Sequence, residues 1–380
     1  MQSKSKKYKI GIVCYPTYGG SGVVATELGM ALANKGHEVH FISYNQPFRL
    51  DIFSDKINFH EVIVPDYPLF DFIPYEHNLT AKLVDVAMHE KLDFLHVHYA
   101  IPHASAALSA KQILASKDIN LPIITTLHGT DITLLGKDKS FKSVIEFAIN
   151  NSDAVTAVSK SLKKETLSSF NIKKEIQVIP NFIDSNLYKY EMDEVLRRNF
   201  ASNDEKIIIH ISNFRKVKRV QDVLNVFAKI KEVIPSKLLL IGDGPERLEM
   251  EQLSRNLNLC DSVRFIGKLK AVEKVLSVSD LFLLPSDTES FGLVALEAMA
   301  SKVPVISSNS GGLPEVNIDG KTGFLLEVKD VNAMARKAIY LLKNQELLED
   351  FKQNAYRHAM EFDLPNILPL YEKIYEELSK

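Results

Sequence analysis

The sequence predicts an α/β protein with two domains, each containing a doubly wound parallel sheet. Short apolar runs alternate with helical patterns along most of the chain, as expected for parallel strands joined by crossover helices. A polar and charged stretch, Leu187 to Lys206, interrupts this alternation once. The length of 380 residues also exceeds one ordinary core. Apolar residues make up 46% and charged residues 25%, which is typical of a globular protein.

The first half begins with a strand at Lys9–Tyr15, a helix at Val23–Lys35 and a strand at Glu38–Ser43. Further elements expected there are a strand at Phe94–His98, a helix at His103–Ser116, and strands at Ile123–Leu127, Ala154–Val158 and Ile176–Ile179. After the polar stretch the alternation restarts. Strands are expected at Lys206–Ile211, Lys237–Ile241, Val263–Ile266, Leu281–Leu284, Val303–Ser307 and Gly323–Leu326, with helices beginning near Lys218, Glu246, Ala271, Leu293 and Asp330. The halves therefore predict two Rossmann-like domains that face each other across a cleft.

Several classes of protein are disfavoured by composition. No apolar run reaches the roughly 18 residues of a membrane span, and the lysine-rich start lacks a signal-peptide core. Cys14 and Cys260 form no disulfide or metal pattern, which fits a reducing cytoplasm. A net charge of −2 disfavours a general nucleic-acid-binding face.

Two carboxylates flank a strand-to-helix turn in the second half. Glu289 follows the apolar strand ending at Leu284, and Glu297 lies about two turns into the next helix. The carboxyl ends of strands are where open α/β sheets bind ligands. Backbone N–H groups at this helix start suit a phosphate; they belong to Ser290, Phe291 and Gly292. A nucleotide-sugar site would use both halves of this segment, whereas the alternative is a solvated helix with two surface glutamates.

A glycine loop joins the first strand to the first helix. Its segment Gly20-Ser21-Gly22-Val23-Val24-Ala25 fits the dinucleotide fingerprint, but no carboxylate follows the second strand until Asp51. A nicotinamide site is therefore a distant alternative. Glycine lets a backbone approach a phosphate or carboxylate closely, although such a loop can also be only a tight turn.

A basic turn follows the first strand of the second half. Its four cations, spread over five residues at a helix start, are Arg215, Lys216, Lys218 and Arg219. A helix N-terminus stabilises an anion by only about 0.3–2 kcal/mol, whereas catalysis requires at least about 8 kcal/mol. We therefore expect Lys218, a neighbouring arginine and helix N-termini to act together on a leaving diphosphate. The alternative is a solvated charge run.

Together these segments resemble the retaining glycosyltransferases of the GT-B architecture, in glycosyltransferase family 4, from about Lys9 to the C-terminus. Finer features resemble the branch that transfers N-acetylglucosamine from UDP to L-malate in the first step of bacillithiol biosynthesis; they include Pro47-Phe48-Arg49-Leu50, His96-Val97-His98-Tyr99-Ala100 and Leu127-His128-Gly129-Thr130-Asp131. The resemblance implies an acceptor-binding domain at 1–184 and a nucleotide-sugar-binding domain at 185–362. It also implies that a helix at about 363–380 packs back on the first domain.

The resemblance further implies roles for individual residues. Glu297 would bind the ribose of UDP, and Glu289 the hydroxyls of N-acetylglucosamine. The diphosphate would meet Lys218, Arg215 and Gly22, and His128 would lie near the sugar 6-hydroxyl. The backbone N–H groups of the helix start would meet the diphosphate or the sugar; they belong to Ser290, Phe291, Gly292 and Leu293. Gly20 and Asn213 are also expected to bind the nucleotide sugar. Many relatives carry an arginine where this chain has Asn213, so its charge is assigned to Arg215. The expected catalytic group comprises Lys218, Arg215, His128 and Glu289.

The implied reaction retains the α configuration, and the departing diphosphate takes the proton of the acceptor. UDP-N-acetylglucosamine and L-malate are then substrates, no cofactor is required, and a divalent metal is not expected to be essential. A homo-oligomer is compatible with the family. Alternatives are another small anionic acceptor, a glycoside hydrolase using Glu289 and Glu297, and a nucleotide-binding regulator without turnover.

Malate is a small dianion, so its pocket needs positive charge and donors. Arg49 is the only arginine before Arg197, and its planar fork can grip a carboxylate, although a surface ion pair is the alternative. Hydroxyl donors at strand ends of this half are Ser21, Tyr99 and Thr130. His96, His98 and His103 lack a completing acidic or cysteine cluster, so polar packing is expected there and no metal site is predicted.

Overall fold

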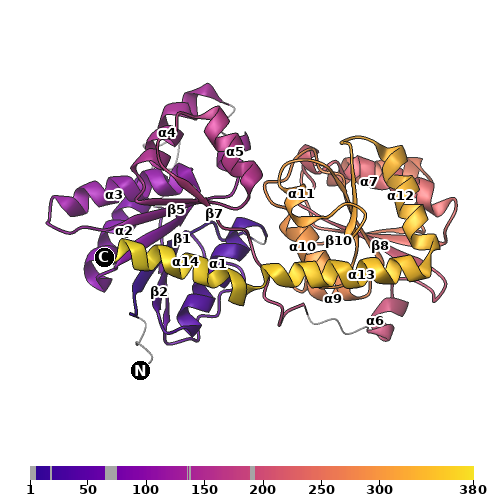
Figure 1. Cartoon of the computed structure of the whole chain (residues 1–380), viewed down its shortest axis with the longest axis horizontal. Coiled ribbons are helices and arrows are strands. Elements are labelled where there is room, and N and C mark those ends of the chain that lie inside the picture. Colours follow the sequence, from indigo (N-terminus) through magenta and orange to yellow (C-terminus); the bar gives the residue numbers. More distant parts are fainter. Residues whose placement is uncertain (1–5, 18, 65–74, 135, 137, 189–192) are drawn as a thin grey trace. The chain divides into compact units, whose positions relative to one another are not determined.

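The computed structural model describes residues 6–17, 19–64, 75–134, 136, 138–188 and 193–380. Contacts divide the chain into two units. Unit 1 contains Met1–Asn181 and the C-terminal Pro365–Lys380, and unit 2 contains Phe182–Leu364. Each unit has a parallel sheet with helices, so the α/β class with two Rossmann-like domains is confirmed (Figure 1).

The sheet of unit 1 has seven parallel strands in the order β3-β2-β1-β4-β5-β6-β7. Their bounds are Lys9–Val13 (β1), Glu38–Ser43 (β2), Ile57–Glu61 (β3), Phe94–His98 (β4), Ile123–Leu127 (β5), Ala154–Ala157 (β6) and Ile176–Val178 (β7). Strands β2, β4 and β5 have the bounds expected from their apolar runs. Strand β3 was not expected, because its Ile-Asn-Phe-His-Glu sequence is half polar and its residues are mostly only half-buried.

The helices of unit 1 connect these strands and include one from the end of the chain. They are Ser21–Asn34 (α1), Tyr75–Glu90 (α2), Ser105–Ala115 (α3), Lys142–Asn151 (α4), Lys160–Ser169 (α5) and Leu364–Leu378 (α14). Short turns of helix lie at Ala100–Ala104, Thr130–Leu134 and Lys139–Phe141. Helix α14 packs on unit 1 through Tyr375, whose ring stacks on Phe94 of β4 at 5.4 Å.

Unit 2 repeats this plan with six parallel strands in the order β10-β9-β8-β11-β12-β13. Their bounds are Lys206–Ile211 (β8), Ser236–Ile241 (β9), Val263–Gly267 (β10), Leu281–Leu284 (β11), Val305–Ser308 (β12) and Gly323–Leu326 (β13). The helices are Glu194–Arg198 (α6), Val220–Lys231 (α7), Arg247–Asn256 (α8), Val272–Ser277 (α9), Leu293–Ala300 (α10), Leu313–Val316 (α11), Val331–Lys343 (α12) and Gln345–Ala359 (α13), followed by a 3₁₀ turn at Met360–Phe362. Within the described ranges, no helix is long and apolar enough to cross a membrane.

Both sheets reverse their winding beside their first strand. Strand β1 lies between β2 and β4, and β8 lies between β9 and β11. On either side of the first strand the crossover connections run in opposite directions, so the loops at the carboxyl ends of these strands stay uncovered. Ligands bind at such uncovered loops in open α/β sheets. The loops after β1 and β4, and those after β8 and β11, are therefore the places to look for a site.

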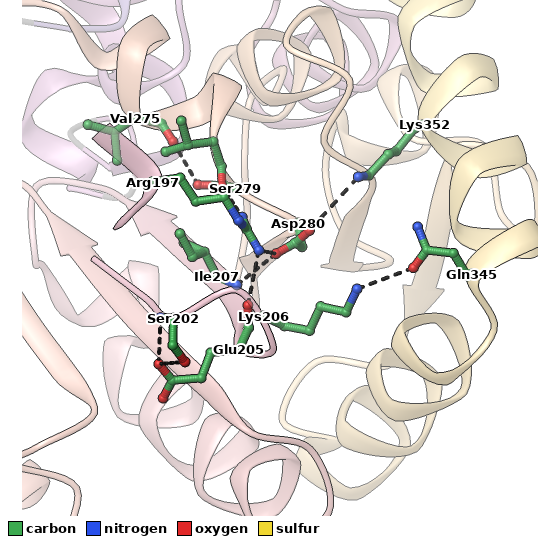
Figure 2. A network of polar contacts seen from close by, with 11 residues as sticks. Arg197, Ser202, Glu205, Lys206, Ile207, Val275, Ser279, Asp280, Gln345 and Lys352 are labelled. Atoms are coloured by element: carbon green, nitrogen blue, oxygen red, sulfur yellow. Dashed lines mark hydrogen bonds and ion pairs between the residues drawn. The ribbon is translucent and has the colours of Figure 1, made fainter. Parts of the chain in front are cut away.

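The opposite ends of β8 and β11 are fixed by a buried ionic network (Figure 2). Asp280 accepts hydrogen bonds from Arg197 Nη2 at 2.9 Å and from the Ile207 N–H at 2.8 Å, and Lys352 Nζ lies 3.9 Å away. Arg197 also donates to the carbonyl of Val278 at 2.6 Å. The network ties α6 and α13 to the sheet with every charge partnered, so it is a structural feature of unit 2.

Candidate active site

The loops after β8 and β11 meet through an ion pair. Lys218 Nζ lies 2.6 Å from Glu289 Oε1, and Ser286 Oγ donates to the same oxygen at 2.8 Å. The two charged side chains are 20% and 11% exposed, so solvent screens them only in part. The structure thus brings together the cation and the carboxylate that the sequence assigned to a diphosphate and a sugar.

The basic turn has a different shape from the expected start of a helix. Lys216–Lys218 forms a separate 3₁₀ turn, and α7 begins only at Val220. Between them Arg219 adopts a left-handed conformation, with φ of 51°. Its guanidinium is held by Asp222 at 2.5 Å and by Asp287 at 3.3 Å, so Arg219 joins the turn to the Glu289 loop.

The other predicted residues of this turn differ in exposure. Asn213 and Arg215 are exposed, whereas the ring of Phe214 between them is fully buried in the core of unit 2. Burial of Phe214 anchors the turn and leaves the side chains on either side of it in solvent. Arg215 is therefore available at the surface of this loop, and its link to a diphosphate stays a prediction.

A buried histidine under the turn was not identified from the sequence. His210 Nδ1 lies 2.8 Å from the carbonyl of Leu283, and its Nε2 lies 2.8 Å from Ser212 Oγ. A carbonyl only accepts, so Nδ1 carries the proton and Nε2 accepts from the Ser212 hydroxyl. Burial lowers the pKa of His210 to about 4, so the ring stays neutral and fixes the start of the basic turn.

Two glycines after β12 pack directly on the Glu289 loop. A Cβ added to Gly311 would lie 2.1 Å from the Glu289 carbonyl oxygen, and one added to Gly312 would lie 2.5 Å from that of Ser290. The Gly312 N–H also donates to the Glu289 carbonyl at 2.7 Å. These glycines were missed, although a glycine pair just after a buried strand is a signal of close backbone approach.

Helix α10 starts at Leu293 after Gly292, whose φ of 99° favours glycine. Phe291 is buried, and its ring lies 5.8 Å from that of Phe362, while Ser290 and Leu293 are half-buried at the helix start. The second carboxylate lies only about one turn into this helix, not the two turns expected, because α10 begins at Leu293. Glu297 is 8% exposed, and Tyr188 donates its hydroxyl to Glu297 Oε1 at 2.8 Å.

In unit 1 the glycine loop leads into α1, which begins at Ser21 and therefore contains Gly22. Gly20 has φ of 61° and is exposed, and a Cβ there would meet open space. A Cβ on Gly22 would lie 2.6 Å from both Thr17 Oγ1 and the Tyr15 carbonyl oxygen, so this glycine permits close packing inside the loop. Such packing is the structural alternative that the sequence left open for Gly22.

Of the residues expected to bind an acceptor, Ser21 and Tyr99 contact each other, and Arg49 contacts Glu27 of α1. Ser21 Oγ lies 2.6 Å from the Tyr99 hydroxyl, which joins the loops after β1 and β4. Arg49 Nη1 lies 2.6 Å from Glu27 Oε1, with both side chains largely buried. Thr130 is exposed after β5 and belongs to neither of these two contacts.

Three histidines in β4 and just after β5, His96, His98 and His128, form a buried row of neutral rings. His98 Nδ1 lies 2.8 Å from His128 Nε2, and His96 contacts Thr126 at 2.7 Å and the Tyr375 hydroxyl at 2.8 Å. Burial lowers the pKa of His96 and of His128 to about 3. At neutral pH the His128 ring is therefore uncharged, and its expected place in the catalytic group stays a prediction.

Comparison with known proteins follows this division into units. Residues 18–187 match the family described as Glycosyltransferase Family 4, and residues 192–358 match Glycosyl transferases group 1. A Bacillus anthracis protein named N-acetyl-alpha-D-glucosaminyl L-malate synthase is 51% identical over 374 residues, which cover 98% of this chain and 97% of that protein. An uncharacterized glycosyltransferase of Methanocaldococcus jannaschii is 28% identical, covering 97% of both chains.

Solved structures share the whole fold. Sucrose-phosphate synthase from Thermosynechococcus elongatus superimposes with a TM-score of 0.81 at 22% identity, covering 98% of this chain and 99% of that one. An Anabaena protein in complex with UDP and glucose also gives a TM-score of 0.81, at 19% identity, covering 98% of this chain and 100% of that one. At these identities the likeness establishes the two-domain fold.

Proposed function

Because this chain belongs to the family-4 glycosyltransferases of the GT-B fold, we propose that it transfers N-acetylglucosamine from UDP to the hydroxyl of L-malate. The observation that carries this proposal is the 51% identity, over nearly the whole chain, to the Bacillus anthracis N-acetyl-alpha-D-glucosaminyl L-malate synthase. Bacillithiol biosynthesis is then the pathway of the product. Family membership leaves the hydrolase and non-enzymatic alternatives without support.

Unit 2 holds the donor in this proposal. Lys218 neutralises the diphosphate, Glu289 accepts hydroxyls of the sugar, and Glu297 accepts ribose hydroxyls. Support comes from the 2.6 Å contact of Lys218 with Glu289, which brings a cation and a carboxylate together beside the β8–β11 switch point. Tyr188 orients Glu297 through its 2.8 Å hydrogen bond. The start of α10 adds backbone N–H groups, and Arg215 adds charge from the exposed side of the turn.

The proposed chemical step is a front-face displacement. The bond between sugar C1 and the β-phosphate oxygen breaks, and the malate hydroxyl oxygen bonds to C1 with retained configuration. The hydroxyl proton moves to the leaving phosphate oxygen, so UDP departs protonated at that site. Lys218 stabilises the charge that develops there, and a positioned donor of this kind contributes about 3–4 kcal/mol.

Unit 1 holds the acceptor. Arg49 provides the charge for a malate carboxylate, while hydroxyl donors come from Ser21, Tyr99 and Thr130. Support comes from the position of Ser21 and Tyr99 at the β1–β4 switch point, whereas the ion pair of Arg49 with Glu27 corresponds to the alternative that the sequence left open for this arginine. Neutral His128 donates or accepts one hydrogen bond to the sugar. A divalent metal is not essential in this scheme, since side chains and backbone N–H groups supply the neutralising charge.

A UDP-release assay tests the proposal. Purified protein is incubated with UDP-N-acetylglucosamine and with L-malate, D-malate or no acceptor, in the presence and absence of EDTA. We expect release with L-malate that greatly exceeds the other two and survives EDTA. Release with a different small hydroxy acid but not with L-malate would overturn the acceptor assignment while preserving the transferase.

A further inference from the structure

A second cluster of polar side chains lies in unit 1, on strands β2 and β3 at the sheet edge and at the end of helix α2. His40 of β2 and His60 of β3 face the same side of the sheet, because His60 pairs with Ile42 and side chains two residues apart share a face. His40 Nδ1 lies 3.0 Å from His60 Nε2, and the rings stack at 5.2 Å. Glu90 ends α2, and one ligand atom from each of these residues lies within 4.8 Å of the others.

The spacing of these atoms suits a metal ion. Zinc binds imidazole nitrogen at about 2.0–2.1 Å with tetrahedral geometry, which places two such nitrogens about 3.3 Å apart. The observed 3.0 Å between His40 and His60 is close to that separation. Two imidazoles and one carboxylate form a ligand set that borderline transition metals prefer.

Glu38 contacts the ring nitrogen of His40 that faces away from the cluster. The Glu38 Oε1 atom lies 3.2 Å from His40 Nε2, on the far side of the ring from His60. A carboxylate there favours the proton on Nε2 and leaves the Nδ1 lone pair directed at the cluster. This carboxylate–histidine pairing is the second layer that holds ligating histidines in orientation.

We propose that His40, His60 and Glu90 form a site for a divalent transition-metal ion of the zinc class, oriented by Glu38 and separate from the sugar-transfer residues. The ion would link three elements through its ligands: β2, the edge strand β3 and the end of α2. Its role would be to stabilise this edge of unit 1. The sequence did not indicate this site, because its ligands lie 20 and 30 residues apart on three elements. The proposal concerns stability and leaves the metal-independent transfer unchanged.

The test measures metal binding directly in the untagged, full-length protein after treatment with EDTA. Titration with CoCl₂ should produce the visible absorption of four-coordinate cobalt, saturating at one ion per chain and displaced by ZnCl₂. Zinc should also raise the melting temperature. His60→Gln should abolish the cobalt band, and Glu38→Gln should weaken binding by roughly 10–100-fold, as is usual for a second-layer residue.

His77→Gln is the matched control, since His77 is exposed at the start of the same helix α2. It should leave the cobalt band and the zinc stabilisation unchanged. Circular dichroism establishes that each variant is folded, and His60 is only half-buried, so its substitution spares the core. A protein without the cobalt band, or a band equally strong in His60→Gln, would overturn the proposal.

Discussion

Lys218 and Glu289 neutralise each other across 2.6 Å, although 71 residues separate them in the chain. Each side chain therefore holds the other in place before any donor arrives. In the proposed reaction, a charge that is already oriented would need no rearrangement as the leaving group develops its own charge. The Ser286 hydroxyl fixes the same carboxylate oxygen and strengthens that orientation.

Replacing Lys218 by Ala should lower kcat by roughly 10²–10³-fold, the usual loss for one positioned donor at a developing charge. Single-turnover kinetics with UDP-N-acetylglucosamine and L-malate measure this loss. Lys216→Ala is the control, since Lys216 lies in the same turn but is exposed, and it should keep near-normal kcat. A Lys218→Ala enzyme with unchanged turnover would refute the role of Lys218.

Tyr188→Phe removes the hydroxyl that fixes Glu297 and should weaken UDP binding about tenfold, since a hydrogen bond to a charged group contributes about 1.5–3 kcal/mol. Calorimetric titration with UDP measures this change. The KM for malate should stay the same. Tyr340→Phe, at an exposed position, serves as control, and equal UDP affinity in both variants would argue against Glu297 as the ribose ligand.

Arg49→Ala should raise the KM for L-malate while sparing the affinity for UDP-N-acetylglucosamine. It should also lower the melting temperature, because Glu27 would keep a buried charge without its 2.6 Å partner Arg49. Adding Glu27→Gln to Arg49→Ala should recover stability but not malate binding. Recovery of both by the double variant would show that Arg49 acts only through the fold.

Acid should destabilise unit 1 through its buried histidines. His96 and His128 have folded pKa values lowered to about 3, against about 6.5 in an unfolded chain. The unfolded state therefore binds protons first as the pH falls, and stability present above pH 6.5 is lost toward pH 3. Each such histidine costs about 1.4 kcal/mol per pH unit in this window.

Melting temperatures measured from pH 7.5 to 5 test this dependence. His96→Gln should reduce the slope by about one proton, because glutamine can still meet the Tyr375 and Thr126 hydroxyls without titrating. His77→Gln, at an exposed position, should leave the slope unchanged. An identical slope in the His96 variant would mean that His96 does not remain neutral in the fold.

Much of the fold could be predicted because buried parallel strands have continuous apolar sequences. Leu281–Leu284 and Lys206–Ile211 were located with correct bounds for this reason. The edge strand β3 and helix α2 were not located, since edge strands are partly exposed and Ile57–Glu61 contains more polar than apolar side chains. The start of α7 was placed too early, because charge pattern does not reveal the left-handed Arg219.

Sequence could predict which site residues lie close together only where the strand order determines their positions. Glu289 and Lys218 each follow a strand beside the switch point, so their proximity follows from strand order. The partners Tyr188 and His210 were not predictable, because their contacts depend on side-chain packing between segments that are distant in the chain. Tyr188 meets Glu297 across 109 residues, and no local pattern in the sequence encodes that pairing.

The assignment of α14 to unit 1 affects how the chain can be made (Figure 1). The Tyr375 ring stacks on Phe94, and its hydroxyl forms a hydrogen bond with His96. Residues late in the chain therefore complete a core whose strands are synthesised first. A nascent chain emerging from the ribosome can finish unit 2 before it can finish unit 1. Loss of Pro365–Lys380 would therefore damage the unit whose strands come earlier in the chain.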